Sequence, residues 1–345
     1  MSFFSLSPAR PSTSTMSDRL AQTLGHLSSA PAAAATASSS AASGYEFSVN
    51  RNGRLTAAQR DFYEKNGFIV IKGVVPPSDL EAYRERFVKL CNREVESPPM
   101  MTVMRDLSNA KDRHLKGEQI INKVQHFEDD DVLFSYCKHP AVLDYVESFI
   151  GGDIMSVHTM LINKPPHVGA LGRHPLHQDL HYFPFRPANR VVCAWTAMER
   201  VSKANGCLVA LPGTHKGTLL EHDYPEWGDQ GGVNKMYHGV KGISKDDSAM
   251  AYLEMDPGDT VFFHPILIHG SGANMTSGYR KAISCHYASS ECHWIDVKGT
   301  SQEFVAEEIA DLLKKMTKGA DLSLTIQDIF RYKSRLVRGE YGELV

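Results

Sequence analysis

Six short apolar runs between residues 154 and 288 restrict the fold of this chain more than any other feature of its sequence. Turns of Gly, Pro, Asn and Asp separate the runs, as in Lys203-Ala-Asn-Gly206 and Asp256-Pro-Gly-Asp259. Runs of this length between such turns are typical of antiparallel β-structure. The predicted strands cover residues 154–162, 191–198, 207–211, 250–255, 260–268 and 281–288.

Helical patterns flank the strand-rich segment. Thr56 and Gln59 form a predicted capping box that begins a helix over 56–65, and a short strand is expected at 68–71. Ser78 and Glu81 form a second predicted capping box, and three more helices are expected at 140–149, 303–316 and 324–336. Helices on both sides of an antiparallel core predict a mainly β fold. We expect a double-stranded β-helix, which is a cupin-like jelly-roll barrel with a ligand cavity between its two sheets.

The first 45 residues differ in composition from the rest of the chain. Ser, Ala, Thr and Pro dominate them, and such a segment has too little apolar surface to order itself. We therefore expect a low-complexity N-terminal targeting segment over 1–45 and a single folded domain over 46–345.

A short polar motif lies just after the first long predicted strand. His177-Gln178-Asp179 supplies an imidazole and a carboxylate, and His269 supplies a second imidazole ninety residues after Asp179. Two imidazoles and one carboxylate on one face of a metal are the ligand set of non-haem Fe(II) oxygenases, which leave other coordination positions open. Arg280, eleven residues after His269, offers a planar guanidinium suited to the far carboxylate of 2-oxoglutarate.

His264 competes with His269 for the role of the second imidazole. His264 lies within the strand-like run 259–268, and His269 directly follows that run. We favour His269 because Gly270 to Asn274 form a predicted turn that would leave its side chain at the mouth of the barrel. Its spacing to Arg280 also fits two side chains that point inward from successive antiparallel strands. His264 is then expected to pack or hydrogen-bond beside the site.

Several longer runs carry a resemblance to a known family. They are RHPLHQDLHYFPFRP at 173–187, MLINKPP at 160–166, VCAWTAM at 192–198, NGCLVALPGTHKG at 205–217 and GDTVFFHP at 258–265. Together with the rest of the segment from about residue 55 to the C-terminus, they resemble the phytanoyl-CoA dioxygenase family. The resemblance implies Fe(II) bound by His177, Asp179 and His269. It also implies 2-oxoglutarate contacts from five residues, which are Lys123, Met160, Trp195, Ser271 and Arg280.

The same resemblance implies an activity. Members of the family 2-hydroxylate phytanoyl-CoA and similar 3-methyl-branched acyl-CoAs, with 2-oxoglutarate and O2 as co-substrates and ascorbate as a supporting reductant. This step belongs to fatty acid α-oxidation in the peroxisome. Of the residues that the resemblance implies, Lys123 by itself reads as a solvated lysine and Trp195 as an ordinary core residue.

The N-terminal segment contains Arg19-Leu20, then five residues, then His26-Leu27. This spacing resembles the N-terminal peroxisomal targeting signal, so we expect recognition by a peroxisomal import receptor. A mitochondrial transit peptide is the alternative, because the region is rich in Ser and poor in acidic residues.

Composition limits the other classes of protein. The chain has 345 residues and a net charge of −3, no Lys/Arg-dense stripe for nucleic acid and no apolar stretch near the ~20 residues that span a bilayer. Its six cysteines lack Cys-X-X-Cys spacing and read as free thiols.

Three other functions fit parts of the pattern. A related hydroxylase with a different small substrate would keep every metal residue. A halogenase of this fold would lack the carboxylate ligand, so Asp179 argues against it. A metal-free or zinc-bound barrel that acts as a binding module would show no 2-oxoglutarate decarboxylation.

Overall fold

The computed structural model describes residues 44–106, 114–166, 172–225, 236–243, 249–316 and 324–344. All of them belong to one compact unit, Ala41–Val345. Residues 1–43 of the predicted targeting segment, including Arg19 and His26, lie outside the described residues. Among the described helices, none is both long and apolar enough to span a bilayer.

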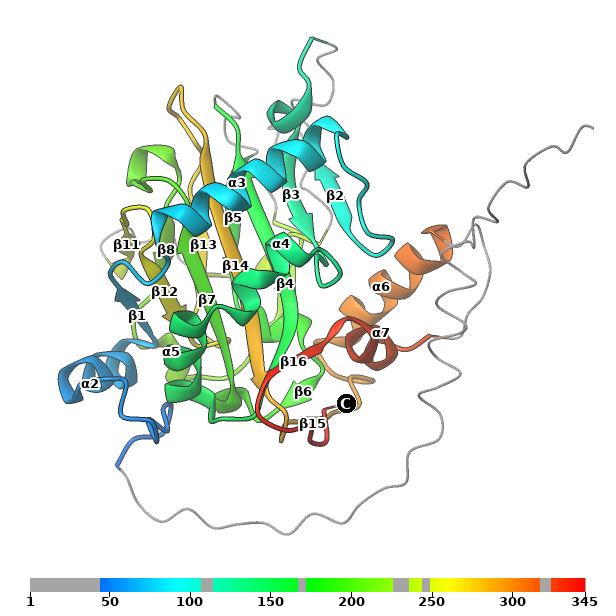
Figure 1. Cartoon of the computed structure of the whole chain (residues 1–345). Coiled ribbons are helices and arrows are strands. Elements are labelled where there is room, and N and C mark those ends of the chain that lie inside the picture. Colours follow the sequence, from blue (N-terminus) through cyan, green and yellow to red (C-terminus); the bar gives the residue numbers. More distant parts are fainter. Residues whose placement is uncertain are drawn as a thin grey trace, which may run out of the picture. The chain divides into compact units, whose positions relative to one another are not determined.

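Two β-sheets form the centre of the folded unit (Figure 1). The larger sheet has eight antiparallel strands in the order β1-β12-β7-β14-β4-β3-β2, and β16 pairs with the first residues of β4. The smaller sheet has the order β11-β8-β13-β5. The strands of the larger sheet are β1 Phe68–Ile71, β2 Thr102–Arg105, β3 Ile121–Gln125, β4 Ile154–Lys164, β7 Val191–Ala197, β12 Thr260–Phe263, β14 Arg280–Ser289 and β16 Arg335–Arg338. Those of the smaller sheet are β5 His174–His177, β8 Leu208–Ala210, β11 Ala251–Leu253 and β13 His269–Ser271.

Helices and short strand pairs complete the fold. In Figure 1, α3, α4 and α5 cross one face of the larger sheet. The α-helices are α2 Ala57–Asn66, α3 Pro77–Asn92, α4 Asp131–Phe134, α5 Pro140–Ile150, α6 Glu303–Met316 and α7 Ile326–Lys333. The 3-10 helices are η2 Gly117–Gln119, η3 Ser135–Lys138, η5 Asp179–Tyr182, η6 Ala188–Arg190, η7 Lys203–Asn205 and η8 Thr214–Lys216. The paired short strands are β6 Phe185–Arg186 with β15 His293–Trp294, and β9 His222–Asp223 with β10 Gly239–Val240.

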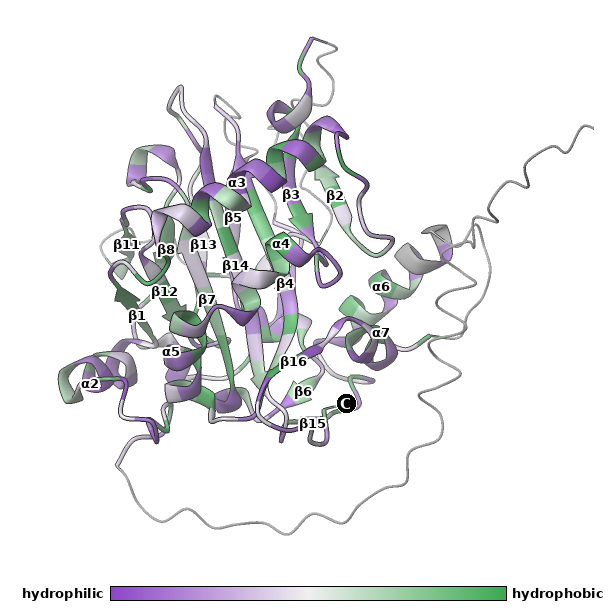
Figure 2. Ribbon diagram, viewed as in Figure 1, coloured by the Kyte–Doolittle hydropathy of each residue, from purple (hydrophilic) through white to green (hydrophobic). Residues whose placement is uncertain are grey.

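The larger sheet is buried on both faces, and alternate residues serve different cores. Ala194, Phe262 and Ile283 pack with the helices, whereas their neighbours Trp195 and Phe263 pack toward the smaller sheet. This follows from the two-residue period of a strand. Figure 2 shows hydrophobic residues concentrated on β1, β8 and β12, while hydrophilic and hydrophobic residues alternate along α3. The predicted jelly-roll class, mainly β with flanking helices, is confirmed.

The predicted strand over 260–268 is wrong in one respect. Strand β12 ends at Phe263, a turn follows, and β13 begins at His269 in the other sheet. Pro265 cannot donate a backbone hydrogen bond, so it ends the strand. His269 and Arg280 lie on successive strands of the chain, β13 and β14, as predicted, but these strands belong to different sheets. Gly270 continues β13 instead of forming a turn.

Two helix boundaries also differ from expectation. The Thr56 capping box is present, but α3 begins at Pro77, so Ser78 lies inside the helix and caps nothing. Proline is preferred in the first turn because its missing N–H is not needed there. The predicted helix 324–336 ends at Lys333, and Leu336 belongs to β16. The six cysteines are free, as predicted.

Candidate active site

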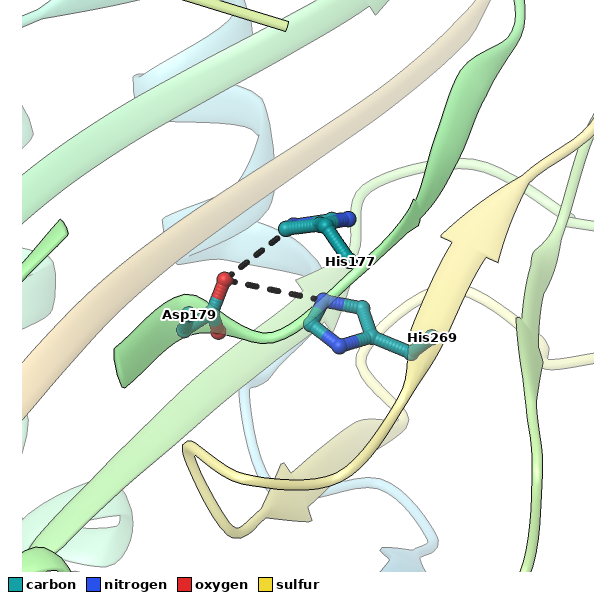
Figure 3. Close-up of side chains that lie close together, drawn as sticks. All are labelled: His177, Asp179 and His269. Atoms are coloured by element: carbon teal, nitrogen blue, oxygen red, sulfur yellow. Dashed lines mark ion pairs between the residues drawn. The ribbon is translucent and has the colours of Figure 1, made fainter. Parts of the chain in front are cut away.

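His177, Asp179 and His269 come together where the smaller sheet faces the larger one (Figure 3). His177 is the last residue of β5, Asp179 begins η5, and His269 begins β13 directly opposite His177. The Nε2 atoms of His177 and His269 lie 3.2 Å and 3.7 Å from Asp179 Oδ1. Two ligands about 2.1 Å from one metal ion lie roughly 3 Å apart at a right angle. The three side chains therefore have the spacing of a metal site.

Backbone contacts fix both imidazoles in one tautomer. His177 Nδ1 lies 2.9 Å from the Pro175 carbonyl, and His269 Nδ1 lies 3.0 Å from the Leu267 carbonyl. A carbonyl oxygen only accepts, so each Nδ1 carries the proton and donates it. Each Nε2 then keeps its lone pair directed at the cluster, which is what a metal ligand requires.

Asp179 is held by a residue outside the predicted set. His286 Nε2 lies 2.8 Å from Asp179 Oδ2, so Oδ1 remains for a metal. Burial pushes the pKa of Asp179 upward, but the facing imidazoles of His269 and His286, together with the close contacts of the carboxylate with His177 and His286, bring it well below the usual range. Burial lowers the pKa of His269 to about 4 against the attraction of Asp179. At neutral pH the carboxylate is ionised and His269 is neutral, as metal binding requires.

His264 lies outside this cluster. Its Nδ1 accepts from the Ile266 N–H, and its Nε2 lies 3.2 Å from Asn189 Oδ1. Both ring nitrogens are thus used in local hydrogen bonds, which favours His269 as the second imidazole.

Asp179, Cys193 and His286 form a second cluster with metal-ligand spacing. Burial raises the pKa of Cys193 well above its usual value. The thiol therefore stays protonated and is a poor metal ligand.

A pocket of about 440 Å³ connects the three residues with the others predicted for the site. One wall of the pocket is formed by the larger sheet, where side chains that face one another across neighbouring strands form rows. Arg280 faces Lys164, Ala282 faces Ile162, Ser284 faces Met160, and His286 faces His158 across β14 and β4. Lys123 and Gln125 of β3 extend the Ile162 and Met160 rows. All eight predicted site residues line this one pocket.

Arg280 occupies one end of the pocket and lacks an anionic partner. Its side chain is 1% exposed, and its Nε and Nη1 atoms are buried with no hydrogen-bond acceptor among the described residues. Its guanidinium lies 5.5 Å from the centre of the Trp195 ring, and the Trp195 indole N–H is also unpaired. Burial lowers the pKa of Arg280 to about 10, so it remains a cation. Because a buried unpaired cation is costly, these donors fit a carboxylate-bearing ligand.

The other three residues predicted to contact 2-oxoglutarate, Lys123, Ser271 and Met160, have different neighbours in the pocket. Lys123, expected from its sequence context to be solvated, is buried, and its ammonium lies 4.6 Å from the centre of the Tyr237 ring. Ser271 Oγ accepts from Lys164 Nζ at 2.7 Å. Met160 is part of the pocket wall.

Two further residues of the site were not predicted in these places: His286, which bonds Asp179, and Lys164, which from the sequence could meet the phosphates of coenzyme A but bonds Ser271. Lys164 shares the face of β4 that carries Met160, and His286 shares the face of β14 that carries Arg280. Both lie at even spacings from a predicted residue. The two-residue strand period was therefore a signal that could have found them.

Solved structures share this architecture. The epimerase SnoN of nogalamycin biosynthesis, in complex with Fe3+, alpha ketoglutarate and nogalamycin RO, matches with a TM-score of 0.52 at 19% identity, covering 70% of this chain and 86% of that chain. EvdO2 from Micromonospora carbonacea var. aurantiaca, complexed with 2-oxoglutarate, matches with a TM-score of 0.52 at 20% identity, covering 70% and 94%. At such identities the likeness concerns the fold.

A jelly-roll that brings two imidazoles, one carboxylate and a buried arginine into one pocket defines an Fe(II)- and 2-oxoglutarate-dependent oxygenase. The family model for phytanoyl-CoA dioxygenase (PhyH) matches residues 63–282. The Homo sapiens "Phytanoyl-CoA dioxygenase, peroxisomal" is 54% identical over 301 residues, 87% of each chain. The Caenorhabditis elegans "Probable phytanoyl-CoA dioxygenase" is 54% identical over 300 residues, covering 84% of this chain and 95% of the relative. This chain belongs to the phytanoyl-CoA dioxygenase family.

Proposed function

We propose that this protein 2-hydroxylates phytanoyl-CoA and related 3-methyl-branched acyl-CoAs in peroxisomal fatty acid α-oxidation. One C–H bond of the acyl chain becomes C–OH, and 2-oxoglutarate and O2 become succinate and CO2. The observation that supports this proposal most strongly is that the His177, Asp179 and His269 cluster shares a pocket with Arg280, whose Nε and Nη1 have no acceptor among the described residues. Relatives that are more than half identical to this chain bear the name of this activity.

We assign roles to the residues from their places in the pocket. His177, Asp179 and His269 would hold Fe(II), which supplies the oxidising chemistry when 2-oxoglutarate and O2 are bound. Arg280 would pair with the distal carboxylate of 2-oxoglutarate, assisted by Ser271 and Lys123, while Trp195 and Met160 wall the co-substrate. His286 orients Asp179 so that one carboxylate oxygen stays free.

The protein's own contribution is to orient the reactants and exclude water. The lining combines apolar side chains, such as Ile162, Trp195 and Phe263, with histidines and basic side chains. A site of this kind binds its ligand in one orientation. Ascorbate is expected to sustain turnover by keeping the iron reduced.

The activity is tested by anaerobic titration of the Fe(II) protein with 2-oxoglutarate, followed by measurement of succinate after O2 is admitted, with and without phytanoyl-CoA. We expect phytanoyl-CoA to stimulate succinate release and to yield one 2-hydroxy product per succinate. A related hydroxylase with another small substrate would bind 2-oxoglutarate equally but show no stimulation. A binding module would release no succinate under either condition.

The domain boundary and the route of import are further parts of this proposal. Relatives from four mammals are named peroxisomal. We propose that residues 1–45 are the targeting segment, that 46–345 is the catalytic domain, and that an import receptor recognises Arg19-Leu20 together with His26-Leu27.

Import is tested in cells with a deletion of residues 1–30. We expect unchanged catalysis and a cytosolic location, because the deleted segment lies outside the proposed catalytic domain. The double variant Arg19→Ala/His26→Ala should also remain in the cytosol. Its continued import into peroxisomes would contradict the assignment.

A further inference from the structure

The pocket has a second polar region, at the end away from Arg280, which the roles assigned above do not use. Lys333, the last residue of α7, enters the pocket there together with His158 of β4 and Gln125 of β3. Ile329 and Phe330, also on α7, line the pocket beside it. The C-terminal helix therefore contributes one cation and two apolar side chains to this end.

Lys333 is a buried cation with few partners. It is 7% exposed, and its Nζ lies 3.2 Å from His158 Nδ1. No carboxylate among the described residues lies within 4.0 Å of this ammonium. Burial lowers the pKa of Lys333 to about 8, opposed by the more distant Glu128, so the side chain is still largely an ammonium at neutral pH. Since an ammonium has three N–H donors, at least one remains for a ligand.

His158 holds the ammonium in place. Burial and the charge of Lys333 keep the pKa of His158 well below its usual value, so the ring is neutral. Its Nδ1 accepts from Lys333, and its Nε2 lies 3.3 Å from the side-chain nitrogen of Gln125. The rings of His126 and Phe183 pack around it. These contacts hold the His158 ring, and its Nδ1 in turn holds the Lys333 ammonium in place.

This region lies next to the candidate metal cluster. His158 is directly opposite His286 in the sheet, with 5.8 Å between the ring centroids, and His286 bonds Asp179. Arg280 and Lys164 are six residues away on the same two strands, which is about 20 Å at the rise of a β-strand. Lys333 thus serves a ligand that approaches the metal cluster from the end opposite Arg280.

We propose that Lys333 donates a hydrogen bond to the thioester carbonyl oxygen of the acyl-CoA and thereby places C2 beside the metal cluster. This inference rests on the proposed function. Hydroxylation at C2 requires the thioester carbonyl, which is bonded to C2, to be held close to the metal. Lys333 has a free donor at that position, and Ile329 and Phe330 offer apolar surface to the methyl-branched chain. His158 is a positioning residue that acts through Lys333.

The test uses the full-length protein loaded anaerobically with Fe(II) and 2-oxoglutarate, titrated calorimetrically with phytanoyl-CoA and, separately, with CoA. Lys333→Met keeps the length of the side chain but removes its donors. We expect phytanoyl-CoA to bind about 10- to 100-fold more weakly, because a charge-assisted hydrogen bond is lost, while CoA and 2-oxoglutarate bind as before. Lys333→Arg should recover part of the affinity. The exposed Lys298, changed to Met, is the matched control and should bind like the wild type.

A second readout separates positioning from a structural role. With O2 admitted, Lys333→Met should release more succinate than 2-hydroxy product, whereas the wild type releases them in equal amounts. If Lys333→Met fails to fold, His158→Phe keeps the ring packing while freeing the ammonium, and it should show a smaller loss of phytanoyl-CoA affinity and partial uncoupling.

Two results would overturn the inference. Wild-type affinity and coupling in the folded Lys333→Met protein, or in His158→Phe if that is the variant available, would mean that the ammonium does not meet the thioester. Equal weakening for CoA and phytanoyl-CoA would mean that it meets a phosphate instead. Failure of the wild type to hydroxylate phytanoyl-CoA would be a different result, since it would refute the proposed function itself.

Discussion

Arg280 carries a full charge inside the protein, and no carboxylate among the described residues lies within 4.0 Å of it. Lys164, its partner across β4 and β14, is also buried, and burial followed by the charge of Arg280 lowers the pKa of Lys164 well below its usual value. Two neighbouring basic side chains, with no carboxylate within 4.0 Å in the part of the chain that the structure describes, favour an anion at this end of the pocket. At the scale of single residues, we therefore expect this pair to bind the distal carboxylate of 2-oxoglutarate.

Replacement of Arg280 by Ala is expected to weaken the use of 2-oxoglutarate but not the binding of iron. Loss of one half of a buried charged pair typically costs ~2–5 kcal/mol, which corresponds to a tens- to thousands-fold higher requirement. Arg280→Lys should rescue only part, because an ammonium cannot reproduce the two-pronged contact. The measurement is succinate formation against 2-oxoglutarate concentration at saturating iron. An unchanged curve would mean that another basic residue holds the distal carboxylate.

Replacement of His177, Asp179 or His269 by Ala should remove iron without unfolding the protein. Even indirect partners of metal ligands change affinity by roughly 10- to 100-fold, so loss of a ligand should cost at least about 100-fold. The check is iron content per chain, measured beside far-UV circular dichroism. His264→Gln is the control and should retain iron; loss of iron in this variant but not in His269→Ala would reverse the ligand assignment.

The elements show why some boundaries were predictable and others were not. A local signal marks the start of α2, because the Thr56 hydroxyl accepts from the Gln59 N–H and the Gln59 side chain accepts from the Thr56 N–H. Ser78 and Glu81 also have the residue types and spacing of a capping box, but the helix α3 already begins at Pro77. The same capping-box pattern therefore begins a helix at Thr56 but lies inside a helix at Ser78, because Pro77, the residue before Ser78, already begins α3.

Thr56→Ala should lower the free energy of unfolding by about 0.5–2 kcal/mol, because it removes the cap of α2. Ser78→Ala is the matched comparison and should change it by less than about 0.5 kcal/mol, since Ser78 is exposed and its hydroxyl donates to the side chain of its neighbour Asp79 rather than to a backbone group of the helix. Urea unfolding of both variants measures the difference. Equal effects would show that Ser78 also caps a helix end.

The strands and the three clustered residues could be read from the sequence because each depends on a short motif. The contacts that complete the pocket could not. The strand period places Lys164 and His158 on the face of β4 that carries Met160, but their positions opposite Arg280 and His286 depend on the register of β4 with β14. Lys333 belongs to the site only because α7 lies beside the pocket. Those are long-range pairings, and no local pattern specifies them.

At the scale of the whole molecule, the fold buries many neutral imidazoles. Burial lowers the pKa of His264 to about 3, of His222 to about 4 and of His181 to about 2. In the unfolded chain each ring would bind a proton near pH 6.5. Their contribution to stability is therefore complete above pH ~6.5 and is lost as the pH falls toward the folded-state values.

We expect the free energy of unfolding to fall by about 1 kcal/mol per buried histidine between pH 7.5 and 5.5. His264→Gln should reduce this loss by about that amount, because glutamine does not titrate. Urea unfolding at the two pH values provides the measurement. A wild-type pH dependence in the variant would show that His264 does not contribute.

The pairing of β4 with β14 has an irregularity just beyond the pocket. From Arg280 to His286 every residue has a partner in sequence, and the register shifts only between His286 and Tyr287, where Val157 is the extra residue on β4. The segment from Arg280 to His286 therefore fixes the distance between the two ends of the pocket. During evolution, an insertion or deletion within this segment would change that distance. A change of length at the bulge would leave the distance unaltered.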